Sequence, residues 1–89
     1  MRRKFRLEIK KTASKKIEEI YKSDKKLYLN MTEVIASIES SPFEEAVKLS
    51  GFQDTWRKRC RHYRIIYVID AKNKIITITR IAKREDAYE

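Results

Sequence analysis

The 89-residue chain carries 22 Lys and Arg residues against 13 Asp and Glu residues, a formal net charge of +9. This length predicts one domain over residues 1–89, and the longest stretch without a charged residue, 27–32, is too short to span a membrane. The single cysteine, Cys60, excludes an intramolecular disulfide and fits a reducing compartment, so we expect a basic, soluble, cytoplasmic domain.

The first half of the chain predicts one strand and two helices. Residues 5–9 alternate apolar and charged side chains, which is the period of a half-buried strand. Apolar residues at helical spacing then predict a helix up to about residue 22 and a clearer amphipathic helix over residues 27–38. Ser23 or Asp24 can cap the second helix, and Pro42 follows its end. Residues 43–51 are expected to form a connection in which Val47 and Leu49 plug the edge of the core.

The second half of the chain changes to the period of strands. We expect strands over residues 56–61, 63–70 and 75–81, with Asn73 in a left-handed position in the turn before the last one. The predicted fold is α+β in the order β-α-α-β-β-β, with a helical hairpin packed on one face of a mostly antiparallel four-stranded sheet.

Basic residues gather on the face of this sheet that the helices leave uncovered. Alternation places Arg57, Arg59 and Arg61 on one side of their strand, and Arg64 on the corresponding side of the next. Residues 57–64 contain no acidic side chain, so these charges repel one another unless an anion lies opposite. A phosphate backbone is the common anion of this kind, which predicts a nucleic-acid surface. The basic stretch 1–16 either contacts ribosomal RNA or serves solubility.

Several classes of catalytic site are absent from the sequence. His62 is the only histidine, Gly51 is the only glycine, and no His, Cys or carboxylate cluster has metal-ligand spacing. We therefore expect no metal and no cofactor, and interpret Cys60 as a small core residue. Arg, Lys and Tyr remain, and these hold phosphodiesters, stabilise developing charge and stack on bases. An RNA substrate brings its own nucleophile, the 2′-hydroxyl.

Three segments resemble the RelE/ParE superfamily of bacterial and archaeal type II toxins. Residues 56–67, Trp-Arg-Lys-Arg-Cys-Arg-His-Tyr-Arg-Ile-Ile-Tyr, are similar to the family's two arginines two apart, a tight turn and a Tyr-Arg-aliphatic-aliphatic-Tyr segment. Residues 83–88, Lys-Arg-Glu-Asp-Ala-Tyr, resemble its terminal basic pair with a Tyr four residues after the Arg. Residues 47–51, Val-Lys-Leu-Ser-Gly, resemble its Lys-Leu-x-Gly stretch. The likeness covers nearly the whole chain.

The resemblance implies a metal-independent endoribonuclease that enters the decoding site of the ribosome and cleaves mRNA by 2′-hydroxyl attack, which inhibits translation. Carried over to this sequence, it implies that Arg64 and Arg84 bind the scissile phosphate, that Arg57 and Arg59 hold flanking phosphates or assist proton transfer, and that Tyr88 stacks on a base or orients the 2′-hydroxyl. The expected further RNA-binding residues are Lys58, Arg61, His62 and Lys83. The implied partners are a cognate antitoxin with an acidic or amphipathic segment, the ribosome and mRNA, and no membrane.

Two departures from the family pattern bear on this expectation. The family's second strand carries lysines where this chain has Arg57 and Arg59, and a guanidinium is a poor general base but a good electrostatic clamp. Arg61 and His62 replace the usual turn glycine, which adds a titratable group. The alternatives are a ParE-like inhibitor of DNA gyrase without nuclease activity, and a non-catalytic module that binds ribosomal RNA.

Overall fold

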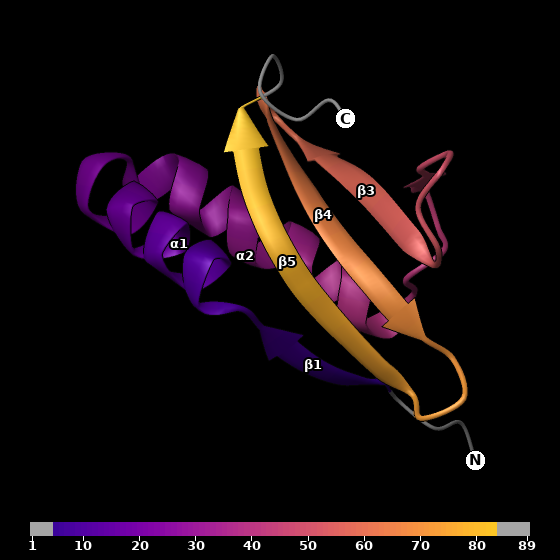
Figure 1. Cartoon of the computed structure of the whole chain (residues 1–89). Helices are drawn as coiled ribbons and strands as arrows, with labels where there is room; N and C mark the ends of the chain where they lie inside the picture. Colours follow the sequence, from indigo (N-terminus) through magenta and orange to yellow (C-terminus); the bar gives the residue numbers. More distant parts are fainter. Residues whose placement is uncertain (1–4, 84–89) are drawn as a thin grey trace.

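The computed structural model describes residues 5–83, in which two helices cover one face of a five-stranded sheet (Figure 1). The elements in chain order are β1 (Arg6–Ile9), α1 (Lys11–Ser23), α2 (Lys25–Ser40), β2 (Val47–Lys48), β3 (Thr55–Cys60), β4 (Tyr63–Asp70) and β5 (Ile75–Lys83). The strand order is β1-β5-β4-β3-β2, with β1 parallel to β5 and every other pair antiparallel. The predicted α+β class and the helical hairpin on one face are confirmed.

The sheet has one more strand than the sequence predicts. Residues 47 and 48, expected within a connection, form β2 because they pair with Arg57 and Trp56 of β3. A 2.9 Å hydrogen bond from the Leu49 backbone N–H to the Thr55 carbonyl continues this pairing. The expectation that Val47 plugs the core is wrong, since this side chain is 51% exposed at the sheet edge.

Asp24 alone separates the two helices. Its backbone N–H donates to the Ile20 carbonyl at the end of α1, and its side chain accepts a 3.1 Å bond from the Leu27 N–H at the start of α2. Ser23, the other predicted cap, instead donates its hydroxyl to the Glu19 carbonyl. One carboxylate therefore turns the chain back on itself and satisfies an orphan N–H of α2. In the residues described, no helix is long and apolar enough to cross a bilayer.

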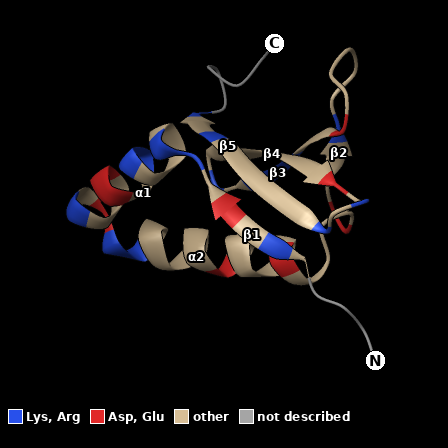
Figure 2. Ribbon diagram, turned by 60° about the horizontal axis from the view of Figure 1, so that its bottom comes forward, with Lys and Arg blue, Asp and Glu red and all other residues tan. Residues whose placement is uncertain are grey.

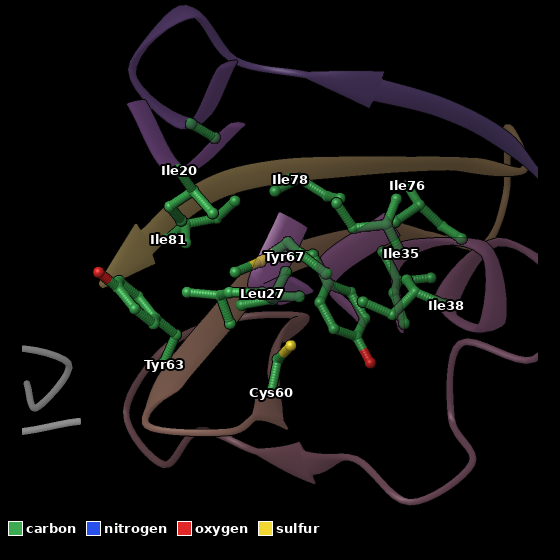
Figure 3. Packing of buried hydrophobic residues seen from close by; sticks show 14 residues of the cluster. Ile20, Leu27, Ile35, Ile38, Cys60, Tyr63, Tyr67, Ile76, Ile78 and Ile81 are labelled. Carbon is green, nitrogen blue, oxygen red and sulfur yellow. The ribbon is translucent and has the colours of Figure 1, made fainter. Parts of the chain in front are cut away.

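The main core lies between the helices and the sheet. Figure 3 shows Leu27, Ile35 and Ile38 of α2 packed against strand residues that include Tyr67 and Ile78. The β4 residues on the side opposite Arg64 lie in this core: Tyr63, Ile65, Tyr67 and Ile69. Cys60 is also buried there, and burial raises the pKa of its thiol, although the neighbouring Arg61 acts in the opposite direction. The interpretation of Cys60 as a core residue is consistent with this position.

A β-bulge changes the phase of β5. Tyr67 pairs with Ile78 and Ile66 pairs with Arg80, so Thr79 has no partner on β4. The Thr79 hydroxyl donates to the Ile66 carbonyl across this irregularity. An extra residue in one strand exchanges the two faces beyond it. Ile78 and Ile81 therefore both face the helices, and Arg80 emerges on the opposite face.

The two turns between β3, β4 and β5 use charged residues in left-handed conformations. Arg61 has a φ of 58° and Lys74 a φ of 59°. The prediction that Asn73 takes the left-handed position is wrong, because the next residue, Lys74, takes it. Asn73 instead donates to the Asp70 carboxylate through its backbone N–H and its side-chain amide. These bonds lower the pKa of Asp70. The prediction of a strand over residues 56–61 is wrong at its end, since β3 ends at Cys60 and Arg61 belongs to the turn.

Candidate functional site

The face of the sheet away from the helices carries the candidate site, and we call it the open face. Cross-strand partners share a face, so the register defines two rows of side chains on it. One row runs from Arg59 through Arg64 to Ala82, and the other from Arg57 through Ile66 to Arg80. The predicted face with arginines from neighbouring strands is therefore present, and β5 adds one arginine to it.

Three of the predicted site residues line one hollow on this face. The hollow has a volume of about 280 Å³ and is lined by Glu45, Val47, Arg57, Arg59 and Arg64. We call it the arginine hollow. Arg59 and Arg64 are direct cross-strand partners, and Arg57 follows two residues away on β3. Guanidinium groups from two adjacent strands thus surround a space large enough for a small anionic group.

The arginines of this hollow differ in burial. Arg64 is only 5% exposed, and the Nε of Arg57 is buried without a hydrogen-bond partner among residues 5–83. A small apolar cluster lies on the same face, consisting of Ile66, Ala82 and Leu49. Leu49 therefore packs on the open face and not at the edge of the main core as predicted. Cations next to apolar groups attract an anion more strongly than cations in water do.

Glu45 is a residue of this site that the sequence reasoning missed. It precedes β2 by two residues and has a φ of 55°, in the left-handed region. The pairing of Val47 with Arg57 brings this segment alongside β3, which places the exposed Glu45 at the edge of the hollow. Residues 17–50 hold seven acidic and four basic side chains, so local composition does not single out Glu45. A carboxylate among arginines provides the proton acceptor that arginine itself does not.

The other predicted RNA-binding residues lie outside the hollow. Lys58 is on the helix side of β3, where its Nζ donates a 2.9 Å hydrogen bond to the Ser37 hydroxyl of α2. Arg61 and His62 are exposed in the turn between β3 and β4, and the His62 ring lies 4.8 Å from the Tyr63 ring. Lys83 is exposed at the end of β5, where it pairs with Tyr63.

Arg84 and Tyr88 lie outside the described residues, so their predicted roles stay predictions. Within residues 5–83, no group of three or more His, Cys, Asp or Glu side chains is arranged to hold a metal ion. Elsewhere in this range Arg6 pairs with Glu8 and Lys16 pairs with Glu19. Within residues 5–83, the site consists of three arginines and one carboxylate that line a hollow large enough for a phosphate group.

Known proteins share this sequence pattern and fold. Residues 7–88 match the family described as "ParE toxin of type II toxin-antitoxin system, parDE". A candidate toxin named RelE1 from Methanocaldococcus jannaschii is 29% identical over 90 residues, which cover 97% of each chain. A chain of the RelE-RelB complex from Pyrococcus horikoshii superposes with a TM-score of 0.74 at 26% identity, over 93% of this chain and 98% of that one. The YoeB/ParE toxin from Agrobacterium tumefaciens has the same fold, with a TM-score of 0.79 at 14% identity over 89% and 98%.

Proposed function

The chain belongs to the RelE/ParE superfamily of type II toxins, and we propose that it is a ribosome-dependent endoribonuclease that cleaves mRNA in the decoding site. The observation that carries this proposal is the arginine hollow, whose lining includes three arginines and one carboxylate. Such a set binds a phosphodiester and serves proton transfer at the same place. Cleavage of mRNA in the cytoplasm then stops translation.

The proposed reaction uses the 2′-hydroxyl of the RNA as nucleophile. Its oxygen attacks the adjacent phosphorus while its proton passes to the Glu45 carboxylate. The bond from phosphorus to the 5′-oxygen breaks, and this oxygen takes a proton from water to become a 5′-hydroxyl, while Glu45 returns its proton to the hydroxide left behind. The other product carries a 2′,3′-cyclic phosphate, which water can open to a 3′-phosphate. A nucleophile supplied by the substrate leaves the protein with positioning and charge stabilisation.

The arginines have separate roles in this proposal. Arg64 is buried at the hollow and holds the scissile phosphate, whose non-bridging oxygens gain negative charge in the transition state. Arg57 and Arg59 approach from β3 and hold the same phosphate or a flanking one. Arg84 and Tyr88 complete the site as the family resemblance implies, by charge neutralisation and by contact with a base. Lys83, Arg61 and His62 contact RNA around it.

A cognate antitoxin is the proposed protein partner. The Pyrococcus relative was solved together with RelB, which supports a complex of the same kind for this chain. An acidic segment of the antitoxin laid on the open face neutralises the arginines and blocks entry of RNA. Binding through these charges weakens as salt rises.

A second candidate function follows from the ParE description of the matching family, which favours a toxin that inhibits DNA gyrase. Two assays on the purified chain separate the two functions. We expect cleavage of mRNA on programmed ribosomes, mapped by primer extension, and no inhibition of supercoiling by gyrase. Inhibited supercoiling with intact mRNA refutes the nuclease.

Site variants then separate catalysis from binding. Arg64→Gln is expected to reduce turnover far more than ribosome affinity, because its charge matters most in the transition state. Equal, few-fold losses of both quantities indicate the non-catalytic RNA-binding module instead. Arg6→Gln is a matched control, since Arg6 is engaged by Glu8 at a distance of 3.1 Å and does not line the hollow.

A further inference from the structure

Arg80 is a cation of the open face that does not line the arginine hollow. Ile76 and Ile78 face the helices, so strict alternation would place the Arg80 side chain on the helix side as well. The bulge at Thr79 places it on the opposite face. It pairs with Ile66 and is exposed, whereas Ile81 beyond it returns to the core. The bulge thus moves Arg80 from the helix side to the open face, and β5 becomes the third strand that carries an arginine on this face.

The register places Arg80 beside the hollow. Arg57 and Arg80 lie on either side of Ile66, two strand spacings or about 10 Å apart between backbones. Arg80 is also the diagonal neighbour of Arg64, because Arg64 pairs with Ala82 two residues along β5. Diagonal neighbours on one face are about 7–8 Å apart. A single strand whose scissile phosphate occupies the hollow can therefore bring a neighbouring phosphate to Arg80.

The guanidinium of Arg80 has no intramolecular use within residues 5–83. None of the ion pairs or side-chain hydrogen bonds in that range involves it. Glu8 on β1 is engaged by Arg6, and β1 ends at Ile9 opposite Ile78, so no strand covers this edge of β5. The residue between β1 and α1 is Lys10, and its backbone N–H donates to the Ile78 carbonyl, so a basic residue lies beside β5 where Figure 2 shows β1 leading into α1. The surroundings of Arg80 are basic and open.

We propose that Arg80 is a second phosphate-binding subsite, which holds a phosphate next to the scissile one in single-stranded RNA. This inference rests on the proposed nuclease function for the identity of the ligand. With Arg57, Arg59 and Arg64 on β3 and β4, the subsite directs the RNA backbone across the strands, from β3 toward β5. Arg80 is a positioning residue and does not touch the reacting atoms.

The salt dependence of RNA binding tests this subsite. The probe is a fluorescent single-stranded RNA with 2′-O-methyl groups, which cannot be cut. Its affinity for the protein is measured by fluorescence anisotropy at salt concentrations from about 0.05 to about 0.2 M. Arg80→Gln is expected to reduce the slope of log K against log salt by about 0.7, the contribution of one contact to a single strand. The affinity at 0.1 M salt should fall about threefold, as suits an exposed ion pair.

Two further variants control this result. Arg80→Lys keeps the charge and should keep the wild-type slope. Arg6→Gln makes the same change of charge on the same face, at an arginine that Glu8 already neutralises, and should also leave the slope unchanged. An unchanged slope in Arg80→Gln, or an equal loss in Arg6→Gln, overturns the subsite.

Cleavage on the ribosome gives a readout of position. The wild type should cut an mRNA that has one neutral methylphosphonate beside the cut more slowly than normal mRNA. Arg80→Gln should cut the two mRNAs at the same rate. Additive losses overturn the inference. Absence of any cleavage by the wild type refutes the nuclease function instead, while the slope measurement still decides whether Arg80 contacts phosphate.

Discussion

The hydroxyl of Tyr67 links the core to the segment that carries Glu45. Tyr67 is fully buried, and its hydroxyl donates a 2.7 Å hydrogen bond to the carbonyl of Pro42 (the ring is labelled in Figure 3). Pro42 begins the connection that leads to Glu45 and Val47 at the hollow. Tyr67→Phe removes the hydroxyl donor and leaves the buried Pro42 carbonyl without this hydrogen bond. The loss lowers the free energy of unfolding by about 1–3 kcal/mol. The melting temperature should fall by roughly 4–8 °C per kcal/mol lost in a domain of this size.

The same phenol makes stability depend on alkaline pH. Burial raises the pKa of Tyr67 to about 12, whereas an unfolded tyrosine ionises near pH 10. Above pH 10 the unfolded state binds fewer protons than the folded state, so the unfolding free energy falls as pH rises. The fall contributed by Tyr67 reaches up to about 1.4 kcal/mol per pH unit between pH 10 and 12. Below pH 10 this contribution is fully present.

Urea unfolding of the wild type and the variant at pH 7 to 11.5 measures both effects. Tyr63→Phe is the matched control, because Tyr63 is buried in the same strand but its hydroxyl makes no hydrogen bond within residues 5–83. Tyr67→Phe should be less stable at pH 7 and should show a weaker loss above pH 10. Equal stability of the two variants at pH 7, or equal alkaline slopes in Tyr67→Phe and wild type, refutes the reasoning.

Three further predictions concern the site and its surroundings. Glu45→Gln should lower the mRNA cleavage rate by about 10²–10⁴, as for loss of a general base, with little change in ribosome affinity; a loss below tenfold removes it from the reaction. Arg59→Gln should reduce the salt slope of RNA binding, whereas Lys58→Gln should not, because the Lys58 Nζ is bonded to Ser37 on the other face; equal effects contradict this assignment of faces. Iodoacetamide should label Cys60 slowly in native protein and rapidly in urea, since burial raises the pKa of this thiol; rapid native labelling shows that the core is open there.

Local patterns were sufficient to predict most of the fold. Alternation in residues 5–9 and 63–70 identified two of the strands, because successive side chains of a strand point to opposite faces of the sheet. The same rule placed Arg57, Arg59 and Arg64 on one face, and the structure brings all three to one hollow. Helical spacing identified α2 to within two residues at each end, since Asp24 caps its start and Pro42 follows its end.

The remaining features depend on contacts between distant segments. Residues 47 and 48 are too few to show a strand period, and only pairing with β3 makes them a strand. This pairing is also what brings Glu45 to the arginines, so no local pattern predicts the carboxylate of the site. Arg80 did leave a signal, because Ile76, Ile78 and Ile81 break the two-residue period at Thr79. Such a break predicts a bulge and an exchange of faces.

The identity of the nucleophile is the central claim of the proposed function, and a single 2′-O-methyl group tests it most directly. The cut is first mapped on a programmed ribosome, and the nucleotide on its 5′ side is then replaced by its 2′-O-methyl form. We predict that cleavage at this site is abolished while ribosome binding is retained, and that the unmodified mRNA yields a cyclic or 3′-phosphate and a 5′-hydroxyl. Cleavage of the methylated mRNA at the normal rate contradicts the account, because another nucleophile must then attack the phosphate in the arginine hollow.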